Sequence, residues 1–238
     1  MPTPHLILIP GLLCDETVWE HQARALGTLT SIAIADHGEL DSLGKMADAI
    51  LDRAPDRFAL AGHSMGGRVA LEVFRRAPEK VAAIALMDTA YAARGPGVAG
   101  EREAAGRYAL LEKARNEGMR AMGLQWAEPM VHQSRRRDAA LMNAILDMIE
   151  RKTPEIFAAQ IKALLERLDA TPLLSQIRCP TLVLCGREDT WSGLSQHEGM
   201  AAMIPHSRLV VIDDCGHMST MERHGEVTSA MQNWLTSS

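Results

Sequence analysis

The stretch FALAGHSMGG, residues 58–67, decides the fold. Its first half is a continuous apolar run, which is typical of a strand buried on both faces of a parallel sheet. Its second half places a glycine two residues before and two residues after Ser64, and an amphipathic helical pattern begins at Met65. A strand that turns sharply into a helix at such a motif lifts the serine hydroxyl above the edge of the sheet. We therefore predict a strand-turn-helix unit with Ser64 at the turn.

Five further apolar runs, each bounded by turn residues, read as buried strands, and helical patterns lie between most of them. Alternation of strands and helices predicts an α/β fold with a doubly wound, mostly parallel sheet. The sheet should contain about six strands, at residues 6–9, 31–35, 58–61, 81–87, 181–185 and 208–212.

The alternation stops between Met87 and Thr181, where no strand pattern occurs. Apolar residues instead keep helical spacing over residues 141–149 and 157–168. A structureless loop of this length is uncommon in a compact domain. We predict one domain over residues 1–238, with a helical cap at residues 90–170 inserted within it.

Length and composition limit the class of protein. The chain has 238 residues, 47% of them hydrophobic, and a formal net charge of -5, which is ordinary globular composition without the basic balance of a nucleic-acid binder. No apolar stretch is long enough to cross a membrane, and the first residues do not resemble a signal peptide. We expect a cytoplasmic protein with no nucleic-acid partner and no contact with membranes.

The cysteines and the loops give no sign of a metal or a cofactor. Cys14, Cys179, Cys185 and Cys215 form no C-x-x-C pair and no zinc-binding spacing, so we expect buried, reduced thiols. No loop matches a phosphate-binding or dinucleotide-binding motif.

A serine nucleophile needs a general base, and the base needs an acidic residue to orient it. His217 directly follows the predicted strand 208–212, at the edge of the sheet where Ser64 should lie. Asp189 follows the strand 181–185 and gives the chain order serine, aspartate, histidine. Glu188, one residue earlier, and Asp88, at the end of the strand 81–87, are alternative acids.

Acyl transfer also needs donors for the developing oxyanion. The backbone N–H of Met65, directly after Ser64, is one candidate for this oxyanion hole. The other should come from the loop after the first strand, where Gly11 permits a tight turn and Leu12 supplies the N–H.

Residues 62–67, 186–189 and 216–217 together resemble the α/β-hydrolase superfamily, along nearly the whole chain. The chain is most similar to small bacterial members with a helical cap, a group that includes esterases, enol-lactonases and carbon–carbon-bond hydrolases. It departs from them at Pro10-Gly11, where most members carry His-Gly, and in lacking the first two strands of the eight-stranded family sheet. Dehalogenases and epoxide hydrolases of this fold carry an aspartate at the position of Ser64, which argues against both.

The cap should form the wall of the substrate pocket over Ser64. Trp126, Trp191 and Met218 are candidate pocket residues, the last two because they neighbour Asp189 and His217. The chain has few aromatic residues and 14 methionines, so we expect an aliphatic pocket, with Met119, Met122, Leu124 and Met130 as further candidates. Arg135-Arg136-Arg137 could bind a substrate carboxylate or form a solvated helix start.

The resemblance implies a serine esterase, a carboxylesterase that cleaves small to medium carboxylic esters through an acyl-enzyme. Its catalytic triad would be Ser64, Asp189 and His217, and it would need no cofactor. Two alternatives stay open: a carbon–carbon-bond hydrolase or lyase that uses the same triad, and a non-catalytic protein that binds a small molecule in the pocket.

Overall fold

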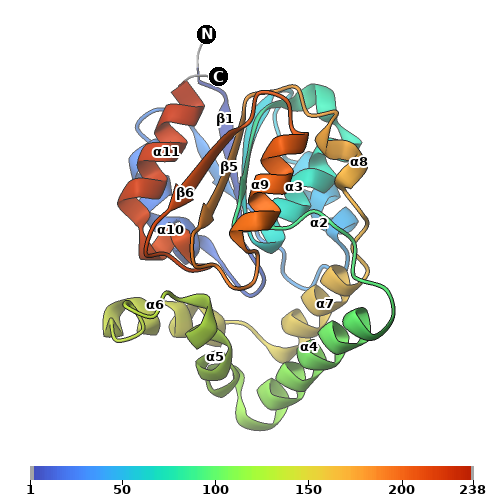
Figure 1. Cartoon of the computed structure of the whole chain (residues 1–238), viewed down its shortest axis with the longest axis vertical. Coiled ribbons are helices and arrows are strands. Elements are labelled where there is room, and N and C mark those ends of the chain that lie inside the picture. The colour runs from blue at the N-terminus through green and yellow to red at the C-terminus, as the bar shows by residue number, and fades with distance from the viewer. Residues whose placement is uncertain (1–2, 237–238) are drawn as a thin grey trace.

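A six-stranded parallel sheet forms the centre of the protein, in the order β2-β1-β3-β4-β5-β6 (Figure 1). The computed structural model describes residues 3–236. All six predicted strands are confirmed, with ends that shift by at most two residues. They are β1 (His5–Ile9), β2 (Ile32–Ile34), β3 (Phe58–His63), β4 (Val81–Met87), β5 (Thr181–Gly186) and β6 (Arg208–Ile212).

Burial along the strands follows their place in the sheet. The central strands β3 and β5 are buried at every residue, as continuous apolar runs require when helices cover both faces. The edge strands β2 and β6 keep partly exposed residues. The strand that leads to Ser64 is therefore fully enclosed in the core.

Helices cover both faces of the sheet (Figure 1). On one face, α1 (Glu20–Leu26) packs against α11 (His224–Thr236). On the other face lie α2 (Leu43–Leu51), α3 (Met65–Arg76) and α9 (Leu194–Met203). Short helices complete the body: η1 (Glu16–Trp19), η2 (Pro78–Lys80), α8 (Thr171–Leu174) and α10 (Ser219–Glu222).

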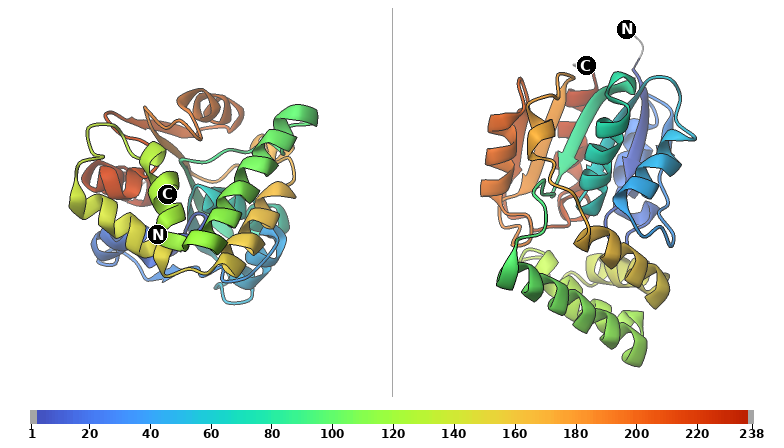
Figure 2. Two further views of the ribbon diagram at one scale, coloured as in Figure 1. Left: turned by 90° about the horizontal axis from the view of Figure 1, so that it is seen from below. Right: turned by 90° about the vertical axis from the view of Figure 1, so that its right-hand side faces the viewer.

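Four helices between β4 and β5 form a separate layer beyond the carboxyl ends of the strands (Figure 2). They are α4 (Gly97–Glu117), α5 (Met119–Ala127), α6 (Ala139–Glu150) and α7 (Pro154–Leu165), with η3 (Glu128–Met130) after α5. Asp138 and Thr153 cap α6 and α7 by accepting hydrogen bonds from the N–H groups of Leu141 and Ile156. The chain thus folds as an α/β sheet with a helical cap.

Side chains of α7 and of the loop before it attach the cap to the loops of the body. Arg151 pairs with Asp15 at 2.8 Å, and Lys162 pairs with Asp41 at 2.6 Å. Gln160 is buried, and its Oε1 accepts a hydrogen bond from the N–H of Leu13 at 2.9 Å. These contacts fix α7 and the segment before it against the loops that follow β1 and β2.

All four cysteines are free thiols. Cys185 and Cys215 are buried as expected, but Cys14 and Cys179 are only partly buried, because both lie in loops rather than in the sheet. Within residues 3–236, no helix combines the length and the apolar surface that crossing a bilayer requires.

The turn between β3 and α3 is strained and closely packed. Ser64 has φ 56° and ψ -119°, in the left-handed region that L-residues rarely adopt. A Cβ on Gly62 would lie 2.3 Å from the carbonyl oxygen of Gly66, and a Cβ on Gly66 would lie 2.0 Å from that of Ile9 in β1. Only glycine at both positions lets the turn close and lets α3 begin directly above β1.

Replacing Gly66 by alanine should therefore destabilise the whole fold. The contact it creates is with backbone, which cannot rotate away, so β1 and α3 would have to separate. We expect the free energy of unfolding to fall by about 3 kcal/mol, as for overpacked cores, measured by urea denaturation. Gly225→Ala is the matched control, because nothing lies within 4 Å of its new Cβ in α11. Equal stability of the two variants would contradict this explanation.

Candidate active site

Ser64, His217 and Asp189 form a continuous hydrogen-bonded chain at the carboxyl edge of the sheet. The Ser64 Oγ lies 2.8 Å from His217 Nε2, and His217 Nδ1 lies 2.8 Å from Asp189 Oδ2. Asp189 Oδ1 accepts two further hydrogen bonds, from the N–H groups of Trp191 and Ser192. The carboxylate is therefore fixed in position and leaves its other oxygen for the imidazole.

Parallel topology brings these three residues together from distant parts of the chain. Ser64 directly follows β3, Asp189 lies three residues after β5, and His217 lies five residues after β6. The carboxyl ends of parallel strands share one edge of the sheet, which is where α/β folds place their ligands. The structure thus joins the three residues that the sequence analysis selected.

The two alternative acids do not contact the imidazole of His217 in the structure. Glu188 is exposed, and its Oε2 accepts a hydrogen bond from the N–H of Cys215 at 3.0 Å. Asp88 is fully buried and accepts hydrogen bonds from the N–H of Gly186 and from the Ser219 hydroxyl. Both carboxylates hold loops at this edge in place.

The loop that carries His217 is fixed by a buried glutamate. Glu222 accepts hydrogen bonds from the N–H groups of Gly216 at 3.1 Å and Met218 at 3.2 Å, on either side of the histidine. The N–H of His217 itself donates to the carbonyl oxygen of Met130, after the cap helix α5, at 2.7 Å. The imidazole therefore has little freedom to leave Ser64.

His63 supports the same loop from below. Burial lowers the pKa of His63 to about 3, so the ring is neutral at physiological pH. Its Nε2–H donates to the carbonyl oxygen of His217 at 2.8 Å. This contact explains why a histidine adjacent to the nucleophile serves in packing rather than as the base.

The charge of Asp189 governs the protonation of His217. Burial disfavours the charged imidazole, but the attraction of the Asp189 carboxylate outweighs burial and raises the pKa of His217 above 6.5. In the same way, burial would raise the pKa of Asp189, but His217 and the hydrogen bonds to the carboxylate hold it below its usual value. Asp189 thus stays ionised and stabilises the protonated form of its partner.

Two backbone N–H groups lie beside Ser64 without an acceptor. Within residues 3–236, the N–H groups of Leu12 and Met65 donate no hydrogen bond, and both residues line the same pocket as Ser64. Met65 opens α3, so its N–H also carries the positive end of the helix dipole. Leu13 has φ 59° and is held by Gln160 of the cap, which fixes the loop that carries Leu12.

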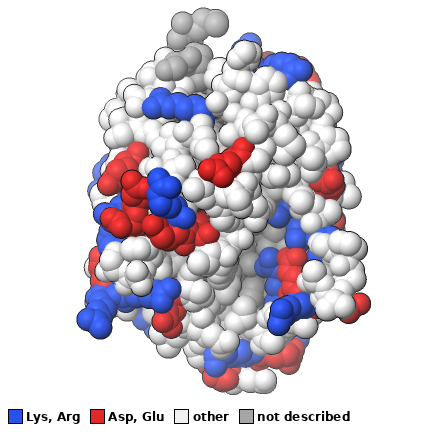
Figure 3. All heavy atoms as spheres, viewed as in Figure 1, with Lys and Arg blue, Asp and Glu red and all other residues white. Residues whose placement is uncertain are grey.

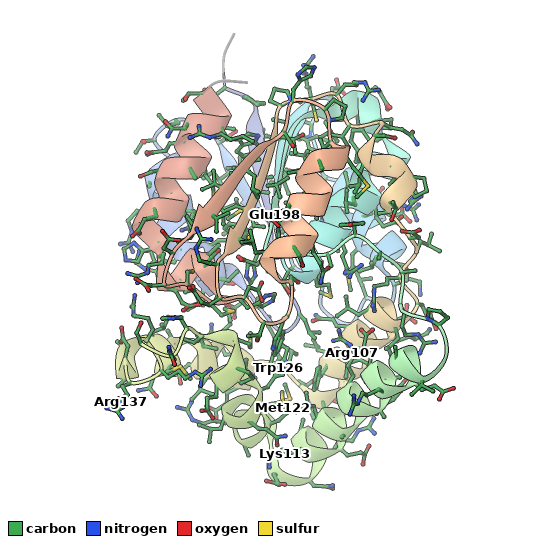
Figure 4. All side chains as sticks on the ribbon, in the orientation of Figure 1. Arg107, Lys113, Met122, Trp126, Arg137 and Glu198 are labelled. Carbon is green, nitrogen blue, oxygen red and sulfur yellow. The ribbon has the colours of Figure 1, made fainter. Side chains whose placement is uncertain are left out.

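A pocket of about 700 Å³ lies between the cap and the body and is open to Ser64 and His217. Trp126 and Trp191 line it, as predicted, with ring centroids 5.3 Å apart. The Trp191 ring also lies 5.2 Å from the His217 ring. Figure 4 shows Trp126 where the cap meets the body, while Met122 lies deeper in the cap.

Several other predicted pocket residues lie elsewhere. Met218 does not line the pocket, because the chain turns into α10 under Glu222 and buries its side chain in the core. Met119 and Met122 pack inside the cap, and Leu124 is exposed, so Met130 is the one methionine of that group that lines the pocket.

The arginine run 135–137 also lies away from the pocket. Arg135 donates to the carbonyl oxygen of Glu222 and pairs with Asp138, while Arg137 points outward from the edge of the cap (Figure 4). The run precedes α6 and is not part of the site.

Aliphatic and methionine side chains outnumber aromatic rings in the pocket wall, as expected, but the expectation did not include its charged part. Besides apolar residues such as Leu110, Phe157 and Leu164, the wall contains charged side chains: Arg68, Arg102, Glu103, Arg107 and Arg167. They come from α3, from α4 and from the segment after α7, so no local sequence pattern joins them. The position of Arg68 in the first turn of α3, directly after Ser64-Met65-Gly66-Gly67, is the signal that could have revealed the first of them.

A buried histidine outside the triad also supports the site. His197 is fully buried, and its Nε2 accepts a hydrogen bond from the N–H of Thr89 at 3.0 Å. It thereby fixes the segment that leaves β4 beneath the pocket.

The chain is similar to several known hydrolases. A pimeloyl-[acyl-carrier protein] methyl ester esterase of Nitrosomonas europaea is 25% identical over 224 residues, 90% of this chain and 88% of that protein. A 2-hydroxy-6-oxo-6-phenylhexa-2,4-dienoate hydrolase of Burkholderia cepacia is 30% identical over 90% of this chain and 70% of its own length. The solved structure of a thermophilic esterase from Thermogutta terrifontis is 29% identical, covers 98% of this chain and 90% of that chain, and superimposes with a TM-score of 0.86.

The family model described as alpha/beta hydrolase fold matches residues 24–224. This range contains the strained turn at Ser64, five of the six strands, the cap, Asp189 and His217. The chain belongs to the α/β-hydrolase family.

Proposed function

We propose that this hydrolase is a serine esterase that cleaves carboxylic esters of small to medium size through an acyl-enzyme. The observation that carries the proposal is the chain of two 2.8 Å contacts from Ser64 through His217 to Asp189, which opens onto a pocket. A serine, a base and an orienting acid in this arrangement are the groups that acyl transfer requires. The esterases among the relatives support the same reaction class.

In this mechanism Ser64 Oγ bonds to the acyl carbon while its proton passes to His217 Nε2. The N–H groups of Leu12 and Met65 hold the oxyanion, and Asp189 stabilises the imidazolium. His217 then gives the proton to the oxygen of the leaving alcohol, and the carbon–oxygen bond breaks. Water attacks the acyl-enzyme with His217 as base again, which releases the carboxylic acid and restores Ser64.

We also propose that residues 90–170 act as a unit, the cap that selects the substrate. Trp126 and Phe157 come from this segment and would contact the group next to the scissile bond. Gln160 from the same segment would hold the loop of the oxyanion donor Leu12.

A second candidate is hydrolysis of a carbon–carbon bond with the same three residues. The observation in its favour is the 30% identity to the Burkholderia cepacia hydrolase, whose name describes a substrate of that kind. Mass spectrometry separates the two. An ester substrate should leave an acyl group on Ser64 after rapid acid quenching, and active enzyme without such an adduct would favour the alternative.

Ser64→Ala should abolish the reaction. We expect the turnover of p-nitrophenyl acetate to fall by roughly a thousandfold or more, as in other serine hydrolases, and labelling by a fluorophosphonate reagent to disappear. Ser229→Ala, at an exposed serine of α11, is the control and should retain both. Near wild-type turnover in Ser64→Ala would overturn the mechanism.

The reaction should weaken in acid, because only the neutral imidazole of His217 accepts the serine proton. Asp189 raises the pKa of His217 above 6.5, so kcat/KM should fall with a midpoint above pH 6.5 as the pH decreases and should be level above it. Asp189→Asn removes the charge that offsets burial. Its midpoint should therefore move to lower pH, with a loss in kcat of roughly a thousandfold or more.

Glu188→Gln is the matched control for this pH profile, because Glu188 is adjacent in sequence but does not contact His217. Its midpoint should equal that of the wild-type enzyme. A shift in Glu188→Gln with none in Asp189→Asn would show that the wrong acid has been assigned.

Gln160→Met should act on the chemical step rather than on substrate affinity. It removes the acceptor for the Leu13 N–H and loosens the loop of Leu12, so we expect kcat to fall about tenfold with KM within about twofold. Lys162→Met, on the same helix, removes only the exposed pair with Asp41 and should change neither constant. Equal effects of the two variants would assign Gln160 to cap stability alone.

A further inference from the structure

One part of the pocket wall beside Ser64 is built from arginines. Arg68, Arg102, Arg107 and Arg167 line the pocket together with a single acid, Glu103. The hollow seen in the space-filling view contains blue and red atoms of this kind between the cap and the body (Figure 3). Such a density of positive charge is unusual next to a site for neutral esters, because apolar walls suffice to bind those.

Glu103 neutralises only part of this charge. Its Oε1 accepts hydrogen bonds from Arg107 at 3.0 Å and 3.1 Å and from Arg167 at 2.8 Å, while its Oε2 accepts a second one from Arg167 at 2.8 Å. Burial opposes ionisation, but these arginines outweigh it and hold the pKa of Glu103 below its usual value. One negative charge is thus shared between two guanidinium groups.

Among the described residues Arg68 forms no salt bridge, and Glu103 acts on it only as a nearby charge. Its Nη1 donates to the carbonyl oxygen of Ala92 at 2.9 Å, and Arg167 Nε lies 3.4 Å from the same oxygen. Burial and the nearby charge of Arg167 lower the pKa of Arg68 to about 9, which leaves it protonated at neutral pH. Arg68 is only partly buried and faces the pocket, so its guanidinium can bind an anion that enters the pocket.

Arg68 is also close to the nucleophile. It lies in the first turn of α3, four residues after Ser64, which directly precedes the helix. Both residues line the same pocket. An anion held by Arg68 would therefore belong to the molecule whose acyl carbon reaches Ser64.

We propose that the substrate carries an anionic group, a carboxylate or a phosphate, which Arg68 binds together with Arg107 and Arg167 while Ser64 attacks the ester carbonyl of the same molecule. This inference rests on the proposed function and names its substrate class: an acid ester, with one ionised end and one ester end. Guanidinium groups bind both kinds of anion through paired N–H donors, and such charge-assisted hydrogen bonds are stronger than neutral ones. The apolar side chains of Leu110, Phe157 and Leu164 would contact the chain between the two ends.

Monomethyl adipate and dimethyl adipate test this proposal, because they present the same methyl ester, and the far end is a carboxylate in one and a neutral methyl ester in the other. The value for the diester is halved, because it carries two equivalent ester groups. We expect kcat/KM for the monoester to exceed that for the diester by about tenfold or more, the value of one charge-assisted hydrogen bond. Methyl 5-phosphonopentanoate is the phosphorus counterpart, and the better of the two anionic esters identifies the anion. Equal kcat/KM for all three esters would overturn the proposal.

Arg68→Gln should reduce the ratio of kcat/KM for the anionic and neutral esters by about tenfold, and Arg68→Lys should restore part of it. Because both esters are measured on one preparation, a partly folded variant leaves the ratio valid. Arg115→Gln is the control, since Arg115 is exposed on α4, pairs with Glu112 and does not line the pocket. An unchanged ratio in Arg68→Gln would contradict the role of Arg68.

Binding to Ser64→Ala protein separates this inference from the proposed function. Calorimetric titration should show that monomethyl adipate binds about tenfold more tightly than dimethyl adipate, and that a second substitution, Arg68→Gln, removes the difference. If the wild-type protein cleaves neither ester and resists the fluorophosphonate reagent, the proposed function fails, while the titration still decides on the anion site. If it cleaves both equally and the titration shows no difference, only the anion site fails.

Discussion

The close approach of β1 to the start of α3 is the constraint on which the rest of the structure depends. Gly66 lies against the carbonyl oxygen of Ile9, and this contact brings the helix directly over the neighbouring strand. The chain can reach α3 only through a left-handed residue, Ser64. The same turn places Ser64 and Met65 together in the wall of the pocket. The packing of the central strands offsets the backbone strain at Ser64.

Much of the fold could be predicted from the sequence, because its signals are local. The strands are continuous apolar runs, and the glycine-rich turn between β3 and α3 predicts a strand-turn-helix unit. His217 and Asp189 could be selected because each follows such a strand, and parallel topology then decides where they meet. Helix α4 could not be predicted in the same way, since it buries only Gly100, Leu111 and Ala114 and so has no apolar period.

The charged wall of the pocket could not be predicted for a different reason. Arg68, Glu103 and Arg167 are separated by dozens of residues and meet only when the cap folds over the body. Composition predicted the aliphatic part of the pocket. It is an average over the whole chain, so it could not show which charged side chains line this one cavity. Met218 shows the same limit, because its neighbour His217 faces the pocket while Met218 itself turns into the core.

Helix α7 joins two parts of the pocket that a substrate would touch at once. Gln160 in its second half holds the loop after β1, and Arg167, two residues past its end, lies among the other arginines. Seven residues of chain separate these two, a span of about 10 Å if the rise is helical throughout. Helix α7 thus sets the distance between the oxyanion loop and the arginines, which under our proposal bind the two ends of one substrate. A ligand too short or too long for that span would have to displace α7, and the displacement would reach the oxyanion loop as well.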